Sequence, residues 1–274
     1  MLKTRIVTAI FLLTGLILLL FSASAPVWSI AALIVTWLGA REWSGFIRLS
    51  ETSKIFNTAL FLLIGAGLIM LPKTSLSDYE GLARILILGL ASFFWVVIAP
   101  IWLIRNSVLN SKWMMTALGM LMLMATCIAL QGLREISPWL LLGTILTVSI
   151  ADSAAYFAGK RFGKHKLAPE ISPGKTWEGV YGALAAVTLY GAILCYTQNF
   201  SFWLIVSLWM LVALSVIGDL IESLMKRKAG VKDSGTLLPG HGGVLDRIDG
   251  MLPTLTVTLF CIYLALFNGL GLGR

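Results

Sequence analysis

Acidic and basic residues are concentrated together in one short stretch of the sequence, residues 223–249. Carboxylates in such a stretch can bind magnesium, which takes one or two of them together with water and phosphate oxygens. Lysine, arginine and histidine beside them can bind phosphate. This mixture is what phosphoryl or nucleotidyl transfer requires. The acids in or just before the stretch are Asp219, Glu222, Asp233, Asp246 and Asp249, and the basic residues are Lys226, Arg227, Lys228, Lys232, His241 and Arg247.

Spacing places several of these groups side by side. Asp246 and Asp249 are one helical turn apart. The glycines and the proline between residues 230 and 243 predict a tight loop whose backbone can approach a ligand closely. One side of a single helix would carry the residues at i, i+3, i+4 and i+7, which are Asp219, Glu222, Ser223 and Lys226.

A further carboxylate, Asp152, lies inside an apolar run. A charged side chain at that depth is costly and usually marks a functional position. It shares a helical face with Ser149, Tyr156 and Gly159, so the face could line a polar cavity. The alternative, in which Asp152 only anchors a neighbouring helix, stays open.

The loop after this run, residues 159–176, is strongly basic and ends in Ser-Pro-Gly-Lys-Thr. That ending resembles the close of a P-loop, but the P-loop needs a glycine five positions before Gly174, where this chain has Pro169. A helix beginning near Trp177 would still offer free N–H groups to a phosphate, with Lys175 beside it. The basic cluster could also bind anionic lipid headgroups.

Composition indicates what holds these residues in place. Hydrophobic residues make up 58% of the 274 positions and charged residues only 12%, which excludes an ordinary soluble domain. Runs of about 20 apolar residues can cross a bilayer, and in lipid they must be helical. We predict an all-α polytopic membrane protein with about nine transmembrane helices. The runs are residues 6–21, 27–40, 55–71, 82–104, 113–130, 138–158, 177–196, 202–224 and 251–270.

The basic residues predict the orientation of the chain. With the N-terminus in the cytoplasm, all but four of the 21 lysines and arginines fall on the cytoplasmic side, as the positive-inside rule expects. Loops 159–176 and 225–250 would then face the cytoplasm. The net charge of +8 is explained by this topology, and because the basic residues are spread among loops a nucleic-acid partner is not expected. The four exceptions are Lys73, Arg84, Arg134 and Arg274.

The sequence divides into an uninformative first part and a chemically rich second part. Residues 1–137 are interpreted as transmembrane helices that supply scaffold and lipid contact, and residues 138–274 as the catalytic region. In the first part, Arg41 and Glu42 are interpreted as an interfacial pair in preference to a functional one. The first run also resembles a secretory signal ending at Ala25; we favour a retained helix, and cleavage would leave the same cytoplasmic loops.

The motifs of the second part resemble the signature of the phosphatidate cytidylyltransferases, also called CDP-diacylglycerol synthases. The matching elements are Ser-x-x-Lys-Arg at 223–227, Lys-Asp at 232–233, Pro-Gly-His-Gly-Gly at 239–243 and Asp-Arg-x-Asp at 246–249. The upstream run ADSAAYFAGKRFGKHKLAPEISPGKTWEG is similar to the bacterial members in particular. The resemblance covers residues 149–250 closely, and the N-terminal half only as a set of spans.

This resemblance implies a reaction, in phospholipid biosynthesis, between CTP and phosphatidate that gives CDP-diacylglycerol and pyrophosphate. It implies Mg²⁺ as the cofactor, with a second cation left open. It implies a bacterial inner membrane with the site facing the cytoplasm, and a homodimer stays open. The metal would be held by Asp219 and Asp246, with Asp249 and Asp152 as further candidates. The catalytic residues would be Asp219, Asp246, Lys226 and Arg247, and the substrate and phosphate contacts Ser223, Arg227, Lys232, His241, Gly242, Gly243 and Lys175.

Two alternatives concern individual residues and two concern the protein class. His241 could merely hydrogen-bond the backbone, and Asp233 could form an ion pair with Lys232 or Lys228. A secondary transporter would also carry intramembrane acids, but it usually shows paired repeats in both halves. The CDP-alcohol phosphotransferases would show aspartates in DGxxAR-type helices, which this chain lacks.

Overall fold

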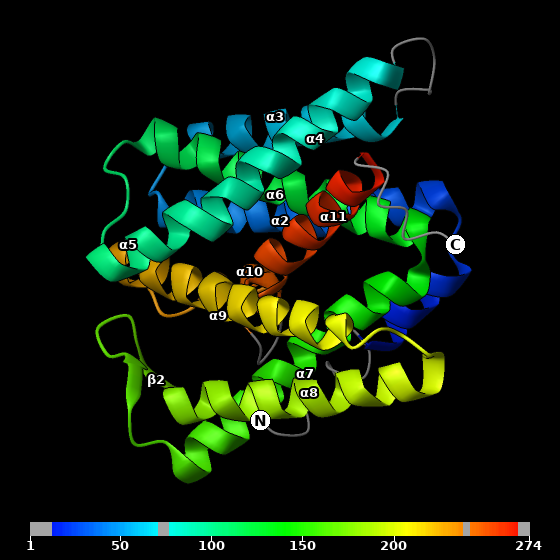
Figure 1. The fold of residues 1–274 in the computed structure, drawn as a ribbon. Helices are drawn as coiled ribbons and strands as arrows, with labels where there is room; N and C mark the ends of the chain where they lie inside the picture. The colour runs from blue at the N-terminus through cyan, green and yellow to red at the C-terminus, as the bar shows by residue number, and fades with distance from the viewer. Residues whose placement is uncertain (1–12, 71–76, 238–241, 268–274) are drawn as a thin grey trace.

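The structure is a computed structural model that describes residues 13–70, 77–237 and 242–267. This part of the chain is helical almost throughout (Figure 1). An apolar helix, Leu13–Ser22, comes first. The helices that follow are α2 Ala25–Phe46, α3 Glu51–Met70, α4 Ser77–Phe93, the π-helix η1 Phe94–Ile98, α5 Ala99–Arg105, α6 Lys112–Ile136, α7 Pro138–Phe162, α8 Trp177–Gln198, α9 Trp203–Ala229, α10 Leu245–Ile248 and α11 Met251–Phe267.

Five helices of the described part are long and apolar enough to cross a membrane. They are the continuous segment Gly81–Arg105, which joins α4 to α5, and helices α6, α7, α8 and α9. Leu13–Ser22 and Met251–Ala265 are shorter apolar helices. Within the described residues each predicted apolar run falls on a helix, so the predicted all-α, polytopic membrane class is confirmed. The count of nine spans and the cytoplasmic N-terminus stay predictions.

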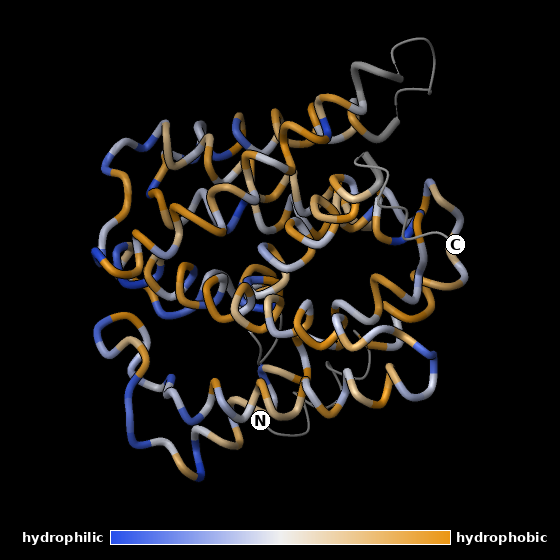
Figure 2. The backbone as a smooth tube through the Cα atoms, viewed as in Figure 1, coloured by the Kyte–Doolittle hydropathy of each residue, from blue (hydrophilic) through white to orange (hydrophobic). Residues whose placement is uncertain are grey.

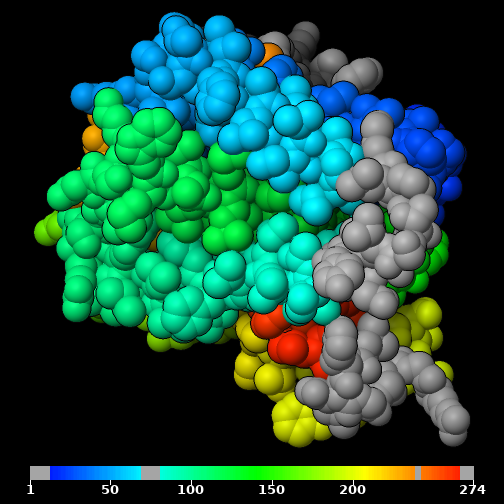
Figure 3. Space-filling model, turned by 90° about the horizontal axis from the view of Figure 1, so that it is seen from above, coloured from blue at the N-terminus to red at the C-terminus, as the bar shows by residue number. Residues whose placement is uncertain are grey.

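Helices of the C-terminal half pack directly against helices of the N-terminal half. Helix α11 packs on α4 and α6 as well as on α9, and α2 packs on α6. Seen from above, the surface is formed largely by segments of the N-terminal half, and α11 shows as a small red area between a cyan-green segment of that half and a yellow segment of the C-terminal half (Figure 3). The division at residue 137 stays a prediction, but the two parts share one packed interior.

The loop between α7 and α8 differs from the all-helical expectation, because it forms a short antiparallel hairpin. Strands β1, Lys166–Ala168, and β2, Ser172–Thr176, pair with Lys166 opposite Thr176 and Ala168 opposite Ser172. Pro169 starts the turn, where its fixed backbone angle suits the second turn position. The turn ends at buried Ile171, whose carbonyl accepts a hydrogen bond from Arg227 Nε at 3.3 Å. This contact holds the hairpin against the end of α9.

Two helix ends define where the loops near the site begin. Helix α8 starts at Trp177 as expected, and Thr176 Oγ1 caps it by accepting from Gly179 N at 3.2 Å. Helix α9 stops at Gly230, whose φ of +69° is the left-handed conformation that glycine adopts most easily. Hydrophilic segments gather near these ends, around β2 and the end of α9 beside α5, at the left of Figure 2.

Candidate functional site

One group of site residues is closed and centred on Lys226 of α9. Its ammonium nitrogen lies 2.5 Å from Glu222 Oε2 and 2.6 Å from Asp246 Oδ1. The pairing of Glu222 with Lys226 is the i, i+4 contact that the sequence spacing predicts. Only 4–16% of these three side chains is exposed. Substrate therefore has little direct access to this group.

The second carboxylate oxygen of Asp246 accepts hydrogen bonds from the loop that precedes α10. Asp246 Oδ2 accepts hydrogen bonds from Ser234 N at 2.9 Å, Ser234 Oγ at 2.8 Å and Gly243 N at 2.8 Å. Burial acts to raise the pKa of Asp246, but the hydrogen bonds from Lys226 and from the backbone outweigh it and hold the pKa well below the usual range. Both carboxylate oxygens are thus in use within the protein. Asp246 as a metal ligand would have to give up one of these contacts, so that role stays a prediction.

A second group, which is open, lies about two turns earlier on α9, at Asp219. Asp219 Oδ2 is 2.5 Å from Lys175 Nζ of β2, and Asp219 Oδ1 accepts from Ser223 Oγ at 3.4 Å. The side chains of Lys175 and Asp219 are 24% and 35% exposed. Asp152 of α7 is exposed and accepts from Ser215 Oγ of α9 at 3.4 Å. These groups can be reached from outside the protein.

Asp249, on the turn between α10 and α11, is assigned to the open group because the charges of that group influence its pKa. Burial raises the pKa of Asp249, and the negative charges of Asp219 and Asp152 raise it further. A hydrogen bond from Gly250 N at 2.7 Å opposes this shift. The turn lies close to α9 because Gly218 has no side chain: a Cβ there would overlap the carbonyl oxygen of Asp249. The positive charge of Lys175 also opposes the shift, so Asp249 is influenced by two other carboxylates and by the lysine that pairs with one of them.

The remaining predicted contacts are distributed around the two groups. Arg247 and Lys232 are exposed, and Arg227 donates to the hairpin. The N–H of Gly243 is used by Asp246 and is not free for a phosphate. His241 lies outside the described residues. Asp233 is exposed, and the described residues show no ion pair between it and Lys228 or Lys232.

Two residues of the site were missed at the level of sequence, Glu42 and Ser234. Ser234 binds Asp246, as described above, and also places its hydroxyl 2.8 Å from Glu42 Oε2. Glu42 forms no ion pair with Arg41 among the described residues, and its carboxylate instead accepts hydrogen bonds from Val244 N and Leu245 N; the interfacial interpretation of Arg41 and Glu42 stays a prediction. The one available signal was a carboxylate next to an apolar run.

Gly242 is expected to be irreplaceable in this loop. Its φ of +81° is strained for any residue with a side chain, and an added Cβ would lie 2.8 Å from Asp246 Oδ2. We expect Gly242→Ala to lose about 1–2 kcal/mol of stability from the backbone conformation alone, with a loss of activity as Asp246 shifts. Thermal unfolding in detergent checks this. The matched control is Gly67→Ala on α3, where an added Cβ meets nothing within 4 Å; equal effects at both positions would contradict the prediction.

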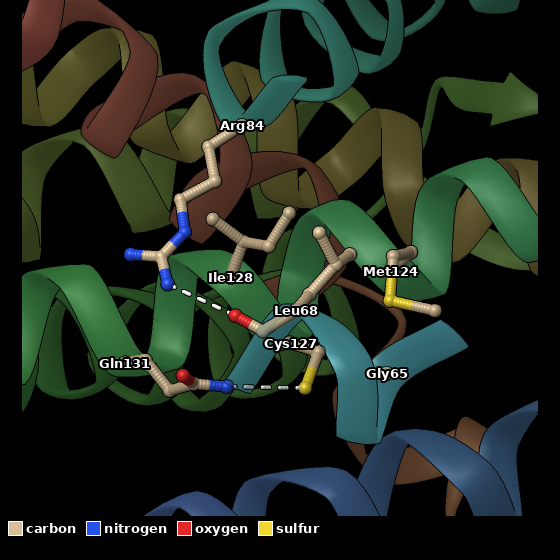
Figure 4. A pocket seen from close by; sticks show the side chains of 7 residues that line it. All are labelled: Gly65, Leu68, Arg84, Met124, Cys127, Ile128 and Gln131. Carbon is tan, nitrogen blue, oxygen red and sulfur yellow. Dashed lines mark hydrogen bonds between the residues drawn. The ribbon is translucent and has the colours of Figure 1, made fainter. Parts of the chain in front are cut away.

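A small pocket between α3, α4 and α6 lies apart from both groups (Figure 4). It is lined by Arg84, which donates to Leu68 O at 3.0 Å, and by Gln131, which contacts Cys127 Sγ at 3.5 Å. Its free volume of about 10 Å³ is that of roughly one water molecule. It contains none of the predicted site residues and cannot hold a nucleotide.

Comparison with known proteins identifies the family. Residues 3–267 match the Cytidylyltransferase family. The chain belongs to this family. It is 34% identical to the phosphatidate cytidylyltransferase of Haemophilus influenzae over 96% of this chain and 98% of that protein. It is 36% identical to the Pseudomonas aeruginosa phosphatidate cytidylyltransferase over 94% and 95%. The family predicted from residues 149–250 is therefore confirmed, and the match extends over the N-terminal half.

Proposed function

We propose that the protein transfers a cytidylyl group from CTP to phosphatidate, giving CDP-diacylglycerol and pyrophosphate. Membership of the Cytidylyltransferase family and the names of its full-length relatives support this reaction. The structural observation that carries it is the open group of Asp219, Asp152, Asp249 and Lys175, in which carboxylates from α7, α9 and the turn after α10 gather near the lysine of β2.

The reaction needs charge neutralisation more than proton transfer. The phosphate of phosphatidate carries about −1.5 to −2 charge at pH 7, so it is already a nucleophile. One of its oxygens forms a bond to the α-phosphorus of CTP, and the bond from that phosphorus to the β-phosphate oxygen breaks. Lys175 and the exposed Arg247 would reduce the repulsion between the two anions. Holding the two substrates in line for the reaction would lower the barrier further.

We infer that Mg²⁺ binds at the open group. Asp219 and Asp249 would hold it, with Asp152 close enough to add charge. Within the described residues no group of three or more acidic, histidine or cysteine side chains could hold a metal ion by itself. Magnesium bound here would therefore take water and phosphate oxygens as its other ligands. When bound, the ion would neutralise phosphate charge. Asp246, whose oxygens are all engaged, would instead order the loop; a second cation stays open.

The placement of the site suits a lipid substrate and a soluble one. The open group lies where α7 and α9 meet the hairpin, near the hydrophilic end of the bundle (Figure 2). The acyl chains would remain in the bilayer while CTP arrives from the aqueous side, attracted by the basic residues. We propose that this side is the cytoplasm and that the membrane is a bacterial inner membrane, which the bacterial relatives support.

Pyrophosphate release by the purified protein in detergent tests the function. We expect release only when CTP, phosphatidate and Mg²⁺ are all present. Chelation should bring the rate to background, and added Mg²⁺ should restore it. Diacylglycerol in place of phosphatidate is the matched lipid control, because it lacks the attacking phosphate. Release without phosphatidate, or none from folded protein with all three components, would contradict the proposal.

A further inference from the structure

Glu42, at the end of α2, reaches across the molecule to the loop that precedes α10. Its Oε1 accepts a hydrogen bond from Val244 N at 2.9 Å, and its Oε2 accepts from Leu245 N at 2.7 Å. These N–H groups open a helix and have no partner within it. Val244 and Leu245 are buried, so leaving their N–H groups unpaired would be costly. A charged acceptor gives them short, strong hydrogen bonds.

Ser234 connects Glu42 to the closed group. Its hydroxyl oxygen lies 2.8 Å from Glu42 Oε2 and 2.8 Å from Asp246 Oδ2, and it accepts from Asp246 N at 3.3 Å. A serine hydroxyl has one proton, so the two carboxylates compete for it. A continuous chain of contacts therefore runs from Glu42 through Ser234 and Asp246 to Lys226.

Two glycines give independent evidence of close contact between the loop and the Glu42 carboxylate. A Cβ added at Gly235 would lie 2.6 Å from Glu42 Oε1. A Cβ added at Gly243 would lie 2.5 Å from Glu42 Oε2, and it would also overlap Ser234 Oγ. Both positions approach the carboxylate more closely than a residue with a side chain allows. The described segments on either side of residues 238–241 therefore both contact the Glu42 carboxylate.

We propose that Glu42 is a positioning residue for cytidylyl transfer. It touches no reacting atom; through Ser234, Val244 and Leu245 it fixes the described ends of the loop, residues 234–237 and 242–246, so that Asp246 keeps its contact with Lys226 on α9. This inference rests on the proposed function, and it assigns part of the catalytic geometry to the N-terminal half of the chain. An acid on α2 would set the conformation of a loop about 200 residues further along.

The test compares Glu42→Ala and Glu42→Gln with the control Glu51→Gln on α3. Glu51 is 83% exposed and contacts only Lys54 among the described ion pairs. Glutamine keeps one acceptor oxygen for the N–H groups and can donate to Ser234 Oγ, so it should restore part of the function. We expect kcat per folded molecule to fall roughly 10-fold to 100-fold in Glu42→Ala, as for a small misplacement of catalytic groups. Glu42→Gln should lie between, with KM for CTP nearly unchanged and the control at wild-type rates.

Two further readouts separate positioning from a general loss of structure. In a double-variant cycle with Ser234→Ala, the effects on kcat should be strongly non-additive, because both residues act through the same contact. Hydrogen exchange in detergent should show faster exchange at the amides of Val244 and Leu245 in Glu42→Ala, with helices α6 and α7 unaffected. The hydrogen-exchange result does not depend on activity. An inactive wild-type protein would therefore contradict the proposed reaction, while the exchange measurement would still test the role of Glu42. An unchanged kcat per folded Glu42→Ala molecule, or unchanged exchange at these amides, would overturn the inference.

Discussion

Asp219→Asn is expected to reduce pyrophosphate release on the order of 100-fold to 1,000-fold, the effect of removing one well-placed electrostatic group from an active site. The substitution preserves the shape of the side chain but removes the charge that faces Lys175 at 2.5 Å. Because the Asp219 side chain is 35% exposed, water can solvate Lys175 when the ion pair is lost, and the melting temperature should change little. The rate and the melting temperature are measured on the same detergent preparation.

The dependence on Mg²⁺ distinguishes two explanations for such a loss. If Asp219 holds the ion, Asp219→Asn should need more Mg²⁺ for half-maximal rate, and Lys175→Met should not. If Asp219 only orients Lys175, the two variants should lose rate equally at every Mg²⁺ concentration. Glu51→Gln, an exposed acid on α3, serves as the control for a loss of negative charge alone. Wild-type activity in Asp219→Asn would remove this residue from the site.

Helical spacing predicted the contacts that lie within α9. The i, i+4 relation places Glu222 against Lys226 and Ser223 against Asp219, and the structure contains both contacts. The apolar runs likewise predicted the helices, since a run of that length in lipid has few other conformations available. In both cases the information is local, and a regular backbone converts sequence distance into spatial distance.

Spacing could not predict that Asp246 of α10 and Asp249 just after it belong to different groups. Asp246 and Asp249 are one turn apart, but Asp246 binds Lys226 and the loop, whereas Asp249 lies near Asp219. The backbone of Asp249 approaches α9 closely at Gly218, and such a contact is a property of packing that spacing does not show. The role of Glu42 was hidden for a similar reason. Its partners lie about 200 positions away, and no periodic pattern marks a contact across that distance.

The hairpin of residues 166–176 was missed because its strands are too short and too polar to show the alternation of apolar and polar residues that predicts a strand. Strand β1 has three residues and β2 has five, and the basic side chains suggested a solvated loop. What holds the hairpin is Ile171 in the core and Arg227 on its carbonyl, both contacts to distant elements. Its consequence for function is the position of Lys175, which β2 presents to Asp219.

The closed group should respond to substitution through stability more than through substrate contact. Lys226 faces two carboxylates that are only 4% and 6% exposed. Lys226→Met would leave both negative charges without a counter-charge. Removing one partner of a buried ion pair typically costs about 3–5 kcal/mol of unfolding free energy. We expect a loss of this size, measured by denaturant or thermal unfolding in detergent, together with inactivation.

A second substitution in the same group should recover part of that stability. In Lys226→Met with Glu222→Leu, one of the two uncompensated charges is replaced by an apolar side chain next to buried Ile221 and Leu224. The double variant should unfold at higher denaturant than Lys226→Met alone, although it should stay inactive because Asp246 still lacks Lys226. A double variant no more stable than the single one would show that the lysine stabilises the fold through its aliphatic stem and not through its charge. Recovery of stability without activity would instead show that the ion pairs of Lys226 serve the geometry of the loop. The protein would then be less stable with these ion pairs than with apolar side chains in their place.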